Sequence, residues 1–260
     1  MSARPAFAHT LHGEWIKFRS LRSTWLTLGG LVAVAVGVTL LSTDASVASY
    51  PNATVEELQQ WDPTNRSLLM FVLAQLIIGV LGIMVVTSEY ATGLVGTSLS
   101  ATPRRHRLLG AKVAMVAAVA LVAGQVLMFA AFLTGQAWFA AAGLPYSTLS
   151  DPTALGAVVG GGLYLAVIGL LAVALGALMR ATAGALAALV TITVLVPALA
   201  ELLPWLDWLF DFWPTMGGAA VIATLPDPDY PQPWLGLAGM GAGAVALLVV
   251  AFVLFERRDA

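Results

Sequence analysis

The chain has 260 residues, of which 59% are hydrophobic and 10% are charged, with a formal net charge of −2. An ordinary soluble domain has about 25% charged residues, so a water-soluble core could not cover this much apolar surface with so few charges. The few basic residues are scattered over predicted loops, which gives no support to a nucleic-acid-binding face. The absence of cysteine excludes disulfides, thiolate metal sites and thiol nucleophiles. The composition therefore favours a protein whose solvent is the lipid bilayer.

The first predicted element is an amphipathic helix within residues 1–24. Its apolar residues recur at three- or four-residue spacing and share one face: Phe7, Leu11, Trp15, Phe18 and Leu21. Such a helix would lie in the plane of the inner headgroups, where it could also be a passive anchor. Glu14 falls within the apolar stripe, and Lys17, one turn further on, is placed to pair with it.

Six apolar runs follow, and each is long enough to cross the hydrocarbon core as a helix of about 20 residues. They are Trp25–Leu41, Leu68–Val86, Val113–Leu133, Ala154–Met179, Ala181–Leu203 and Leu235–Phe255. Only Arg180 and small neighbours separate the fourth run from the fifth. We expect a tight turn there, because one helix through both runs would be about 70 Å long. The predicted fold is an all-α membrane protein with one six-helix domain over residues 25–260.

A cleavable secretory signal is the alternative interpretation of the first run. Ser46-Val47-Ala48 resembles a cleavage site with small residues at its two outer positions. However, the region before the run is long and predicted to be helical, and the run exceeds the usual 7–15 apolar residues of a signal. We therefore expect the first run to remain as a membrane span.

The basic residues predict the orientation of the spans. Eleven of the twelve fall on one side, and Arg66 alone falls on the other. The eleven are Arg4, Lys17, Arg19, Arg22, Arg104, Arg105, Arg107, Lys112, Arg180, Arg257 and Arg258. Short loops rich in Lys and Arg stay in the cytoplasm. We therefore expect a multi-pass protein of the cell membrane with both termini in the cytoplasm and an acidic outer face.

The connection after the second span, residues 88–108, has more order than a simple hairpin turn. Glu89-Tyr90-x-x-Gly93 directly follows the span, Thr97–Thr102 is small and polar, and Pro103 precedes a basic cluster. This pattern predicts a short helix and turn that project into the cytoplasm and end at the proline. Control of topology by the arginines alone is the alternative, but it leaves Glu89-Tyr90-x-x-Gly93 unexplained.

The span interiors hold no charged residue, and their main polar residues are Gln75, Gln125 and Gln136. Ion-coupled carriers usually have ionisable groups at mid-membrane, so the sequence disfavours a secondary carrier and an intramembrane enzyme. Nothing in the sequence predicts a metal site.

Glycine and proline mark three of the spans. Gly156-x-x-x-Gly160 and Gly239-x-x-x-Gly243 predict close helix contacts, either within one subunit or between subunits. Pro197 should kink the fifth span and free a backbone carbonyl, because proline has no N–H to donate.

The connection between the fifth and sixth spans, residues 204–233, holds six prolines and a cluster of tryptophans that includes Trp205 and Trp208. Asp207 and Asp211 are four residues apart, so they share one face of a short helix. The pattern predicts a short outer helical hairpin at headgroup level, or simply an aromatic belt that fixes depth. Residues 42–67 are expected to form a smaller acidic outer loop, flexible in part.

Three motifs together resemble the permease subunits of ABC-2-type ABC transporters. They are Glu14-Trp15-x-Lys17-x-Arg19-Ser20, Glu89-Tyr90-x-x-Gly93 and Pro103-Arg104-Arg105. The six spans agree, so the resemblance covers the whole chain. It implies that the N-terminal helix is a connecting helix and that the segment after the second span holds a coupling helix. That helix would dock into a cleft on a cytoplasmic ATP-binding subunit.

The same resemblance implies the roles of individual residues. The docking residues would be Glu89, Tyr90, Gly93, Thr97, Ser98, Thr102, Pro103, Arg104 and Arg105. The connecting helix would use Glu14, Trp15, Lys17, Phe18 and Arg19. The outer hairpin, with Trp205, Asp207, Trp208 and Asp211, would cap the pathway. The chain departs from the family pattern at Ala91 and Gly96, where relatives often carry basic or polar residues.

The implied function is that of a permease subunit in an ATP-driven exporter. The chain lacks a Gly-x-x-x-x-Gly-Lys-Ser/Thr loop, so we expect it not to be an enzyme and to hold no cofactor. Two separate ATPase subunits would bind ATP and Mg²⁺. A second permease copy or a homologue would complete a pathway between the first, second and fifth spans for a lipid, a peptide or a drug-like compound. The alternatives are a membrane-anchored sensor or assembly protein and an ion-coupled carrier.

Overall fold

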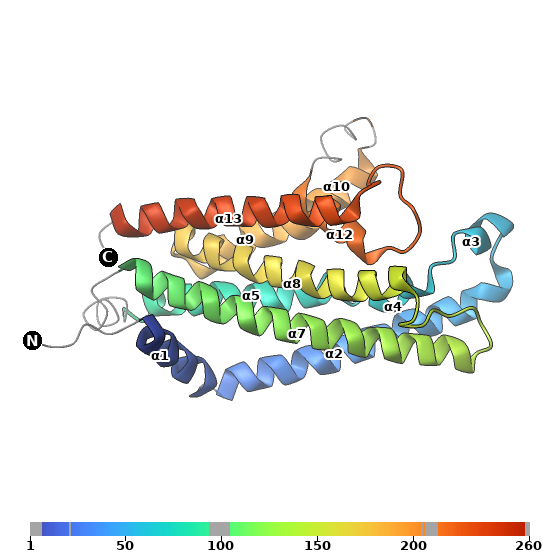
Figure 1. The fold of residues 1–260 in the computed structure, drawn as a ribbon, viewed down its shortest axis with the longest axis horizontal. Helices are drawn as coiled ribbons and strands as arrows, with labels where there is room; N and C mark the ends of the chain where they lie inside the picture. Colours follow the sequence, from blue (N-terminus) through green and yellow to red (C-terminus); the bar gives the residue numbers. More distant parts are fainter. Residues whose placement is uncertain (1–6, 21, 94–104, 204, 206–212, 258–260) are drawn as a thin grey trace, which may run out of the picture.

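The computed structural model describes residues 7–20, 22–93, 105–203, 205 and 213–257, and within them it contains helices and no strand (Figure 1). In chain order the elements are α1 (Phe7–Ser20), α2 (Arg22–Ser49), the 3₁₀ turn η1 (Tyr50–Asn52), α3 (Val55–Gln59), α4 (Pro63–Leu68), α5 (Phe71–Ala91), α7 (Arg105–Ala141), α8 (Pro152–Met179), α9 (Thr182–Val190), the π-helical turn η2 (Thr191–Leu195), α10 (Val196–Leu202), α12 (Pro214–Ala219), the 3₁₀ turn η4 (Ala220–Ile222) and α13 (Pro233–Arg257).

Six helical segments of the described chain are long and apolar enough to cross a membrane. They are Trp25–Asn52, Pro63–Ala91, His106–Ala141, Pro152–Met179, Thr182–Ala200 and Pro233–Arg257. This confirms the predicted all-α fold with six spans. The long helices lie side by side along one direction (Figure 1). We call the end of the bundle that holds α1, the start of α7 and the end of α13 the α1 end, and the opposite end the α3 end.

Several helices extend beyond the predicted apolar runs. The third span continues to Ala141 rather than ending at Leu133, and α2 continues to Ser49. The predicted outer loop over residues 42–67 is therefore wrong at its beginning, and α3 and α4 occupy most of its remainder. The apolar run marks only the part of a helix that matches the hydrocarbon core, whereas backbone hydrogen bonding continues into polar residues.

Helix α8 forms the centre of the bundle. In its most apolar stretch, 72% of the residues are buried, against 22% in the first span. Its small residues allow this position, because a Cβ added at Gly162 would meet the Gln125 amide and one added at Gly169 would meet Ala120. The glycines of the fourth span thus serve packing within this chain. In the sixth span, a Cβ at Gly239 or Gly243 would meet no described atom within 4 Å.

The predicted tight turn between the fourth and fifth spans is confirmed at Arg180. This residue has a φ of 54°, in the left-handed region, and its N–H donates to the Gly176 carbonyl at 3.0 Å. A left-handed residue directly after a helix ends it and satisfies one of its last carbonyls. Helix α9 then begins at Thr182 and returns toward the α3 end (Figure 1).

Pro197 frees a backbone carbonyl in the fifth span, as predicted. Before it, η2 adopts π-helical hydrogen bonding, in which the Val196 N–H reaches the Thr191 carbonyl. In the same register the Ile192 carbonyl would need the N–H of residue 197, which a proline lacks. That carbonyl instead accepts from Trp213 Nε1 at 2.9 Å and Thr215 Oγ1 at 3.0 Å. The freed group thereby ties α12 to the fifth span.

Candidate functional site

Four charged side chains from three helices meet at the α1 end and form what we call the ion cluster. They are Glu14 and Lys17 of α1, Glu89 of α5 and Lys112 of α7. Lys112 Nζ donates to Glu14 Oε2 at 2.8 Å, to Glu89 Oε1 at 2.9 Å and to the Val85 carbonyl at 2.9 Å. A lysine ammonium has three N–H donors, so every proton of this ammonium has an acceptor.

Lys17 completes the ion cluster from its exposed side. Its Nζ lies 2.8 Å from Glu14 Oε1 and 3.0 Å from Glu89 Oε1. The Lys17 side chain is 52% exposed, whereas those of Lys112 and Glu14 are each 5% exposed. Burial of the Lys17 ammonium lowers its pKa, but its hydrogen bonds to the two carboxylates and their negative charge together outweigh burial, so the pKa lies above its ordinary value. Counted together, the two acids and two bases of the ion cluster have no formal net charge.

The helix periods explain how the members of the ion cluster come together. Thr10, Glu14 and Phe18 are four residues apart and are the buried residues of α1. Glu89 follows Val85 by one turn of α5, so its carboxylate and the Val85 carbonyl approach Lys112 from the same face. Lys112 lies two turns into α7, within an otherwise apolar stretch. Removing one partner from such a buried set leaves a charge without compensation, which typically costs about 3–5 kcal/mol.

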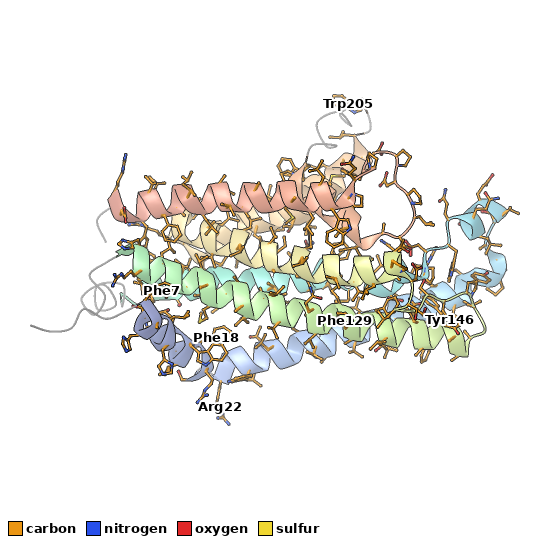
Figure 2. All side chains as sticks on the ribbon, in the orientation of Figure 1. Phe7, Phe18, Arg22, Phe129, Tyr146 and Trp205 are labelled. Atoms are coloured by element: carbon orange, nitrogen blue, oxygen red, sulfur yellow. The ribbon has the colours of Figure 1, made fainter. Side chains whose placement is uncertain are left out.

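The inward face of α1 differs from the predicted apolar stripe. Phe7 and Trp15 are 44% and 41% exposed in this chain, whereas Glu14 is 4% exposed. Phe18 is buried in an apolar cluster with Val86 and Leu109, and Figure 2 labels it on α1. Pairing with Lys112 explains why the acidic residue faces inward. Leu21, also assigned to the stripe, lies outside the described residues.

The remaining residues of the connecting-helix motif lie at the edge of the ion cluster. The rings of Trp15 and Phe18 are stacked with centroids 6.1 Å apart. The side chain of Arg19 is exposed, and its carbonyl accepts a hydrogen bond from Trp25 Nε1 at 3.0 Å. This bond spans the junction between α1 and α2 and helps to set the angle at which the chain enters the first span.

A second set of contacts joins the same end of α5 to the turn between α8 and α9. Arg180 Cζ lies 5.3 Å from the centroid of the Tyr90 ring, within the range of a cation–π interaction. Thr182 Oγ1 donates to Thr87 Oγ1 at 2.9 Å. Helix α5 is thus held from two sides, by the ion cluster and by the turn that contains Arg180.

Gly93 marks the end of the described part of α5. Its φ is 70°, and its N–H donates to the Tyr90 carbonyl at 3.2 Å. Glycine adopts this left-handed conformation without steric cost, whereas other L-residues there are strained. The glycine of the Glu89-Tyr90-x-x-Gly93 motif therefore has a local role: it follows the end of α5 at Ala91 and lies within the predicted coupling segment, residues 88–108.

The structure places some predicted site residues and not others. Thr97, Ser98, Thr102, Pro103 and Arg104 lie outside the described residues, as do Asp207, Trp208 and Asp211 of the outer hairpin. Arg105 begins α7, and its side chain is not described. Trp205 projects away from the bundle and is 72% exposed (Figure 2). Among the described residues, no group of three or more His, Cys, Asp or Glu is placed to hold a metal ion.

The sequence analysis missed the role of Lys112 and counted it only as a charge that controls topology. The signal was present, because Lys112 is surrounded by apolar residues (Leu108 and Leu109 before it, Val113 to Val116 after it). A charged residue within an apolar helical run usually has a buried partner. What the sequence did not reveal is that this partner would be two acids from two other helices.

The six spans define a multi-pass membrane protein. The ion cluster joins the helix before the first span to the second and third spans. A family model described as "ABC-2 family transporter protein" matches residues 10–199. The chain therefore belongs to this family and is a membrane permease of an ABC transporter, a class that works with ABC ATPase subunits. The match includes the whole ion cluster and nearly all of the first five spans. A search of curated proteins found no match.

Proposed function

We propose that this chain is the permease subunit of an ATP-driven exporter, and that the ion cluster transmits the motion of a separate ATPase into the membrane helices. One observation carries the proposal. The segment 94–104 connects α5 to α7, and Glu89 and Lys112, on either side of it, are joined to each other at 2.9 Å. A force applied to this segment reaches two spans whose ends are already fastened together.

The ion cluster also links α1 to α5 and α7. Glu14 receives hydrogen bonds from both lysines, one from its own helix and one from α7. Displacement of α5 and α7 would therefore move α1 with them, rather than slide past it. The ATPase would drive this displacement if its ATP-bound and nucleotide-free states dock differently on the coupling segment, since only differential affinity shifts a conformational equilibrium.

The orientation that this function requires is supported by the basic residues. In the described chain, α1, the start of α7, the Arg180 turn and the end of α13 lie at the α1 end (Figure 1). Arg66, by contrast, lies on α4 at the α3 end. The excess of Lys and Arg at the α1 end favours a cytoplasmic location for this end and for both termini, where a soluble ATPase can reach it.

The proposed complex contains two ATPase subunits and two permease chains, identical or homologous. ATP and Mg²⁺ would bind to the ATPase subunits, because this chain has no phosphate-binding loop. In the first and fifth spans, only 22% of the residues in the most apolar stretch are buried within this chain. Such open faces are available for a second permease chain, for lipid and for an amphipathic or hydrophobic substrate.

Purification of the full chain from its native host in mild detergent tests this function. We expect a stoichiometric ATPase to accompany the wild-type chain and to be lost when Gly93 is replaced by Val, which strains the end of α5. The Lys112→Met variant should still be recovered with the ATPase, because its coupling segment is unchanged. Its ATP hydrolysis should, however, no longer drive transport.

Other outcomes of the same purification would overturn the proposal. Recovery of the chain alone, with normal cellular function after both replacements, would support a sensor or assembly protein. Uptake into liposomes driven by a proton gradient without any ATPase would establish an ion-coupled carrier.

A further inference from the structure

A cavity of about 580 Å³ lies at the α3 end, on the side opposite the ion cluster. Its walls are the first turns of α8 and α13, the turn η4, and the loop over residues 223–232. Binding pockets for small molecules commonly have volumes of about 300–1,000 Å³, so the space suits one organic molecule. The ion cluster and its partners contribute nothing to this cavity.

The loop that forms the cavity is held in shape by one buried carboxylate. Asp62 is 7% exposed, and its Oδ1 caps α4 by accepting from the Asn65 N–H at 2.9 Å. Its Oδ2 accepts from the Thr224 N–H at 2.7 Å and from the Leu225 N–H at 3.4 Å. One side chain thus fixes the start of the loop against a distant helix.

Proline stiffens the rest of the loop. Four prolines line the cavity from this loop and from the start of α13, at positions 226, 228, 231 and 233. Because proline has a restricted φ and no N–H, the loop cannot collapse into regular hydrogen bonding. A preformed wall lowers the entropy that binding would otherwise cost.

The chemistry of the walls selects for a cation with an apolar body. The aromatic side chains of Tyr230 and Trp234 line the cavity, and Asp227 supplies a carboxylate. Asp227 Oδ1 accepts from the Asp229 N–H at 2.9 Å, and among the described residues its Oδ2 accepts no hydrogen bond. Within the part of the chain that the structure describes, no Lys or Arg lines the cavity. An aromatic face and a carboxylate both attract an organic cation and disfavour an anion.

The charges around the cavity also favour an organic cation over an anion. Arg66 is a basic residue at the α3 end; its Cζ lies 4.4 Å from the centroid of the Trp61 ring, and its guanidinium donates to Ser46 Oγ. No ion pair within the described chain joins it to Asp227. Clefts with one sign of charge raise the local concentration of oppositely charged ligands. Trp234 is 50% exposed at the start of a span, the position of tryptophans at the membrane–water interface, where amphiphiles gather.

We propose that this cavity binds an amphipathic organic cation at the non-cytoplasmic surface of the membrane, and that such cations belong to the substrate class of the permease. The assignment as a transport substrate rests on the proposed function, whereas binding by the cavity does not. Gly156 forms part of the wall, and a Cβ added there would lie 3.8 Å from Trp234 Cζ2, an ordinary contact. Alanine is therefore tolerated at 156, and a longer side chain fills the space beside the indole.

A pair of hydrophobic ions of the same shape and opposite charge tests the proposal. The full chain in nanodiscs of neutral phosphatidylcholine is dialysed to equilibrium against tetraphenylphosphonium or tetraphenylborate, and binding to empty nanodiscs is subtracted. We expect saturable binding of tetraphenylphosphonium alone. Asp227→Asn should weaken it about fivefold, the order expected for one partly hydrated charge pair. Asp229→Asn, a matched change on the same loop outside the cavity wall, should not.

The size of the cavity gives a second arm to the test. Gly156→Leu should abolish saturable binding and Gly156→Ala should retain it, with the melting temperature of each variant recorded. If Gly156→Leu fails to fold, Trp234→Leu at its half-exposed position replaces it and should weaken binding about threefold or more, through loss of the aromatic face. Equal saturable binding of both ions, or equal loss in Asp227→Asn and Asp229→Asn, would overturn the proposal.

The binding of tetraphenylphosphonium tests the cavity, and the recovery of an ATPase tests the proposed function, so either can fail without the other. Recovery of the ATPase is measured on the same preparations. A chain that binds tetraphenylphosphonium without an associated ATPase would retain the cavity and overturn the exporter. A chain that recovers the ATPase without saturable binding would overturn only the cavity.

Discussion

The two ends of the helix bundle are fastened by different kinds of bond. At the α1 end, α1, α5 and α7 are joined by side chains of opposite charge, three of them largely buried. In the half of the bundle toward the α3 end, a carboxylate and neutral side chains bind backbone groups. Asp62 accepts from the N–H groups of Thr224 and Leu225, and Trp213 donates to the Ile192 carbonyl midway along the fifth span. Attraction between charges falls off slowly with distance, whereas a hydrogen bond to the backbone requires close alignment. Under the proposed function the α1 end would move as a joined unit, whereas the hydrogen bonds of Asp62 hold the loop at the α3 end in one register.

The largest expected effect comes from Lys112→Met at the α1 end. The change leaves Glu14 and Glu89 without the buried ammonium, so stability should fall by about 3–5 kcal/mol. Lys17→Met is the matched control, since it removes the same group from the same two acids at a half-exposed position, and it should cost less than about 1 kcal/mol. Thermal unfolding of the full chain in nanodiscs measures both. Equal losses of stability in the two variants would show that burial of the lysine does not determine how much it contributes to stability.

An intermediate effect is expected from Asp62→Asn at the α3 end. An amide has one acceptor oxygen where the carboxylate has two, so it cannot both cap α4 and receive the Thr224 N–H. The cost of one unpaired buried group is about 1–3 kcal/mol. Thermal unfolding measures the loss, and added protease should cleave the loop over residues 223–232 faster. Asp229→Asn, which is exposed, should change neither. An undisturbed loop would show that Asp62 does not hold it.

A smaller effect is expected from Trp213→Phe. The Ile192 carbonyl would retain only the Thr215 hydroxyl, at a cost of about 1 kcal/mol. In a Pro197→Ala background residue 197 again has an N–H, so the same replacement should cost less. Trp205→Phe, at an exposed position, is the control. The double-mutant comparison of unfolding temperatures would reject our account of the freed carbonyl if the Trp213 effect is the same with and without the proline.

The smallest effect is a pH dependence at the exposed side of the ion cluster. The folded-state pKa of Lys17 lies above its ordinary value of 10.5. Its contribution to stability should therefore be fully present below pH 10.5 and be lost as the pH rises through the folded value. The difference in unfolding temperature between the wild type and Lys17→Met should be constant at neutral pH and shrink in strong base. A difference that grows with pH would contradict the pKa shift.

Much of the molecule could be predicted from residue patterns. The six spans, the turn at Arg180 and the freed carbonyl at Pro197 depend on hydrophobic length and on local backbone chemistry, which neighbouring residues determine. Pairing of Glu14 with Lys17 is likewise a contact within one helical turn. The inward face of α1 could not be predicted, because the apolar stripe indicated Trp15, whereas a buried partner from α7 directs Glu14 inward.

The cavity at the α3 end lies furthest from what pattern analysis can reach. Its walls come from residues 152–157 and 220–234, and its shape depends on Asp62, which is far from both in the chain. No periodicity relates these segments, since their proximity follows from the packing of α4, α8 and α13. The tryptophans and prolines of the loop signalled an interface, but gave no indication of a cavity.

The amino-acid sequence alone determined the solvent of this protein, the number of its spans and the turn at Arg180, because each depends on the transfer of side chains into lipid or on the bonding of adjacent backbone groups. The tertiary structure decided which charges meet. Lys112 and its two acids come from three helices, and a buried ammonium is stable only where packing brings enough acceptors to surround it.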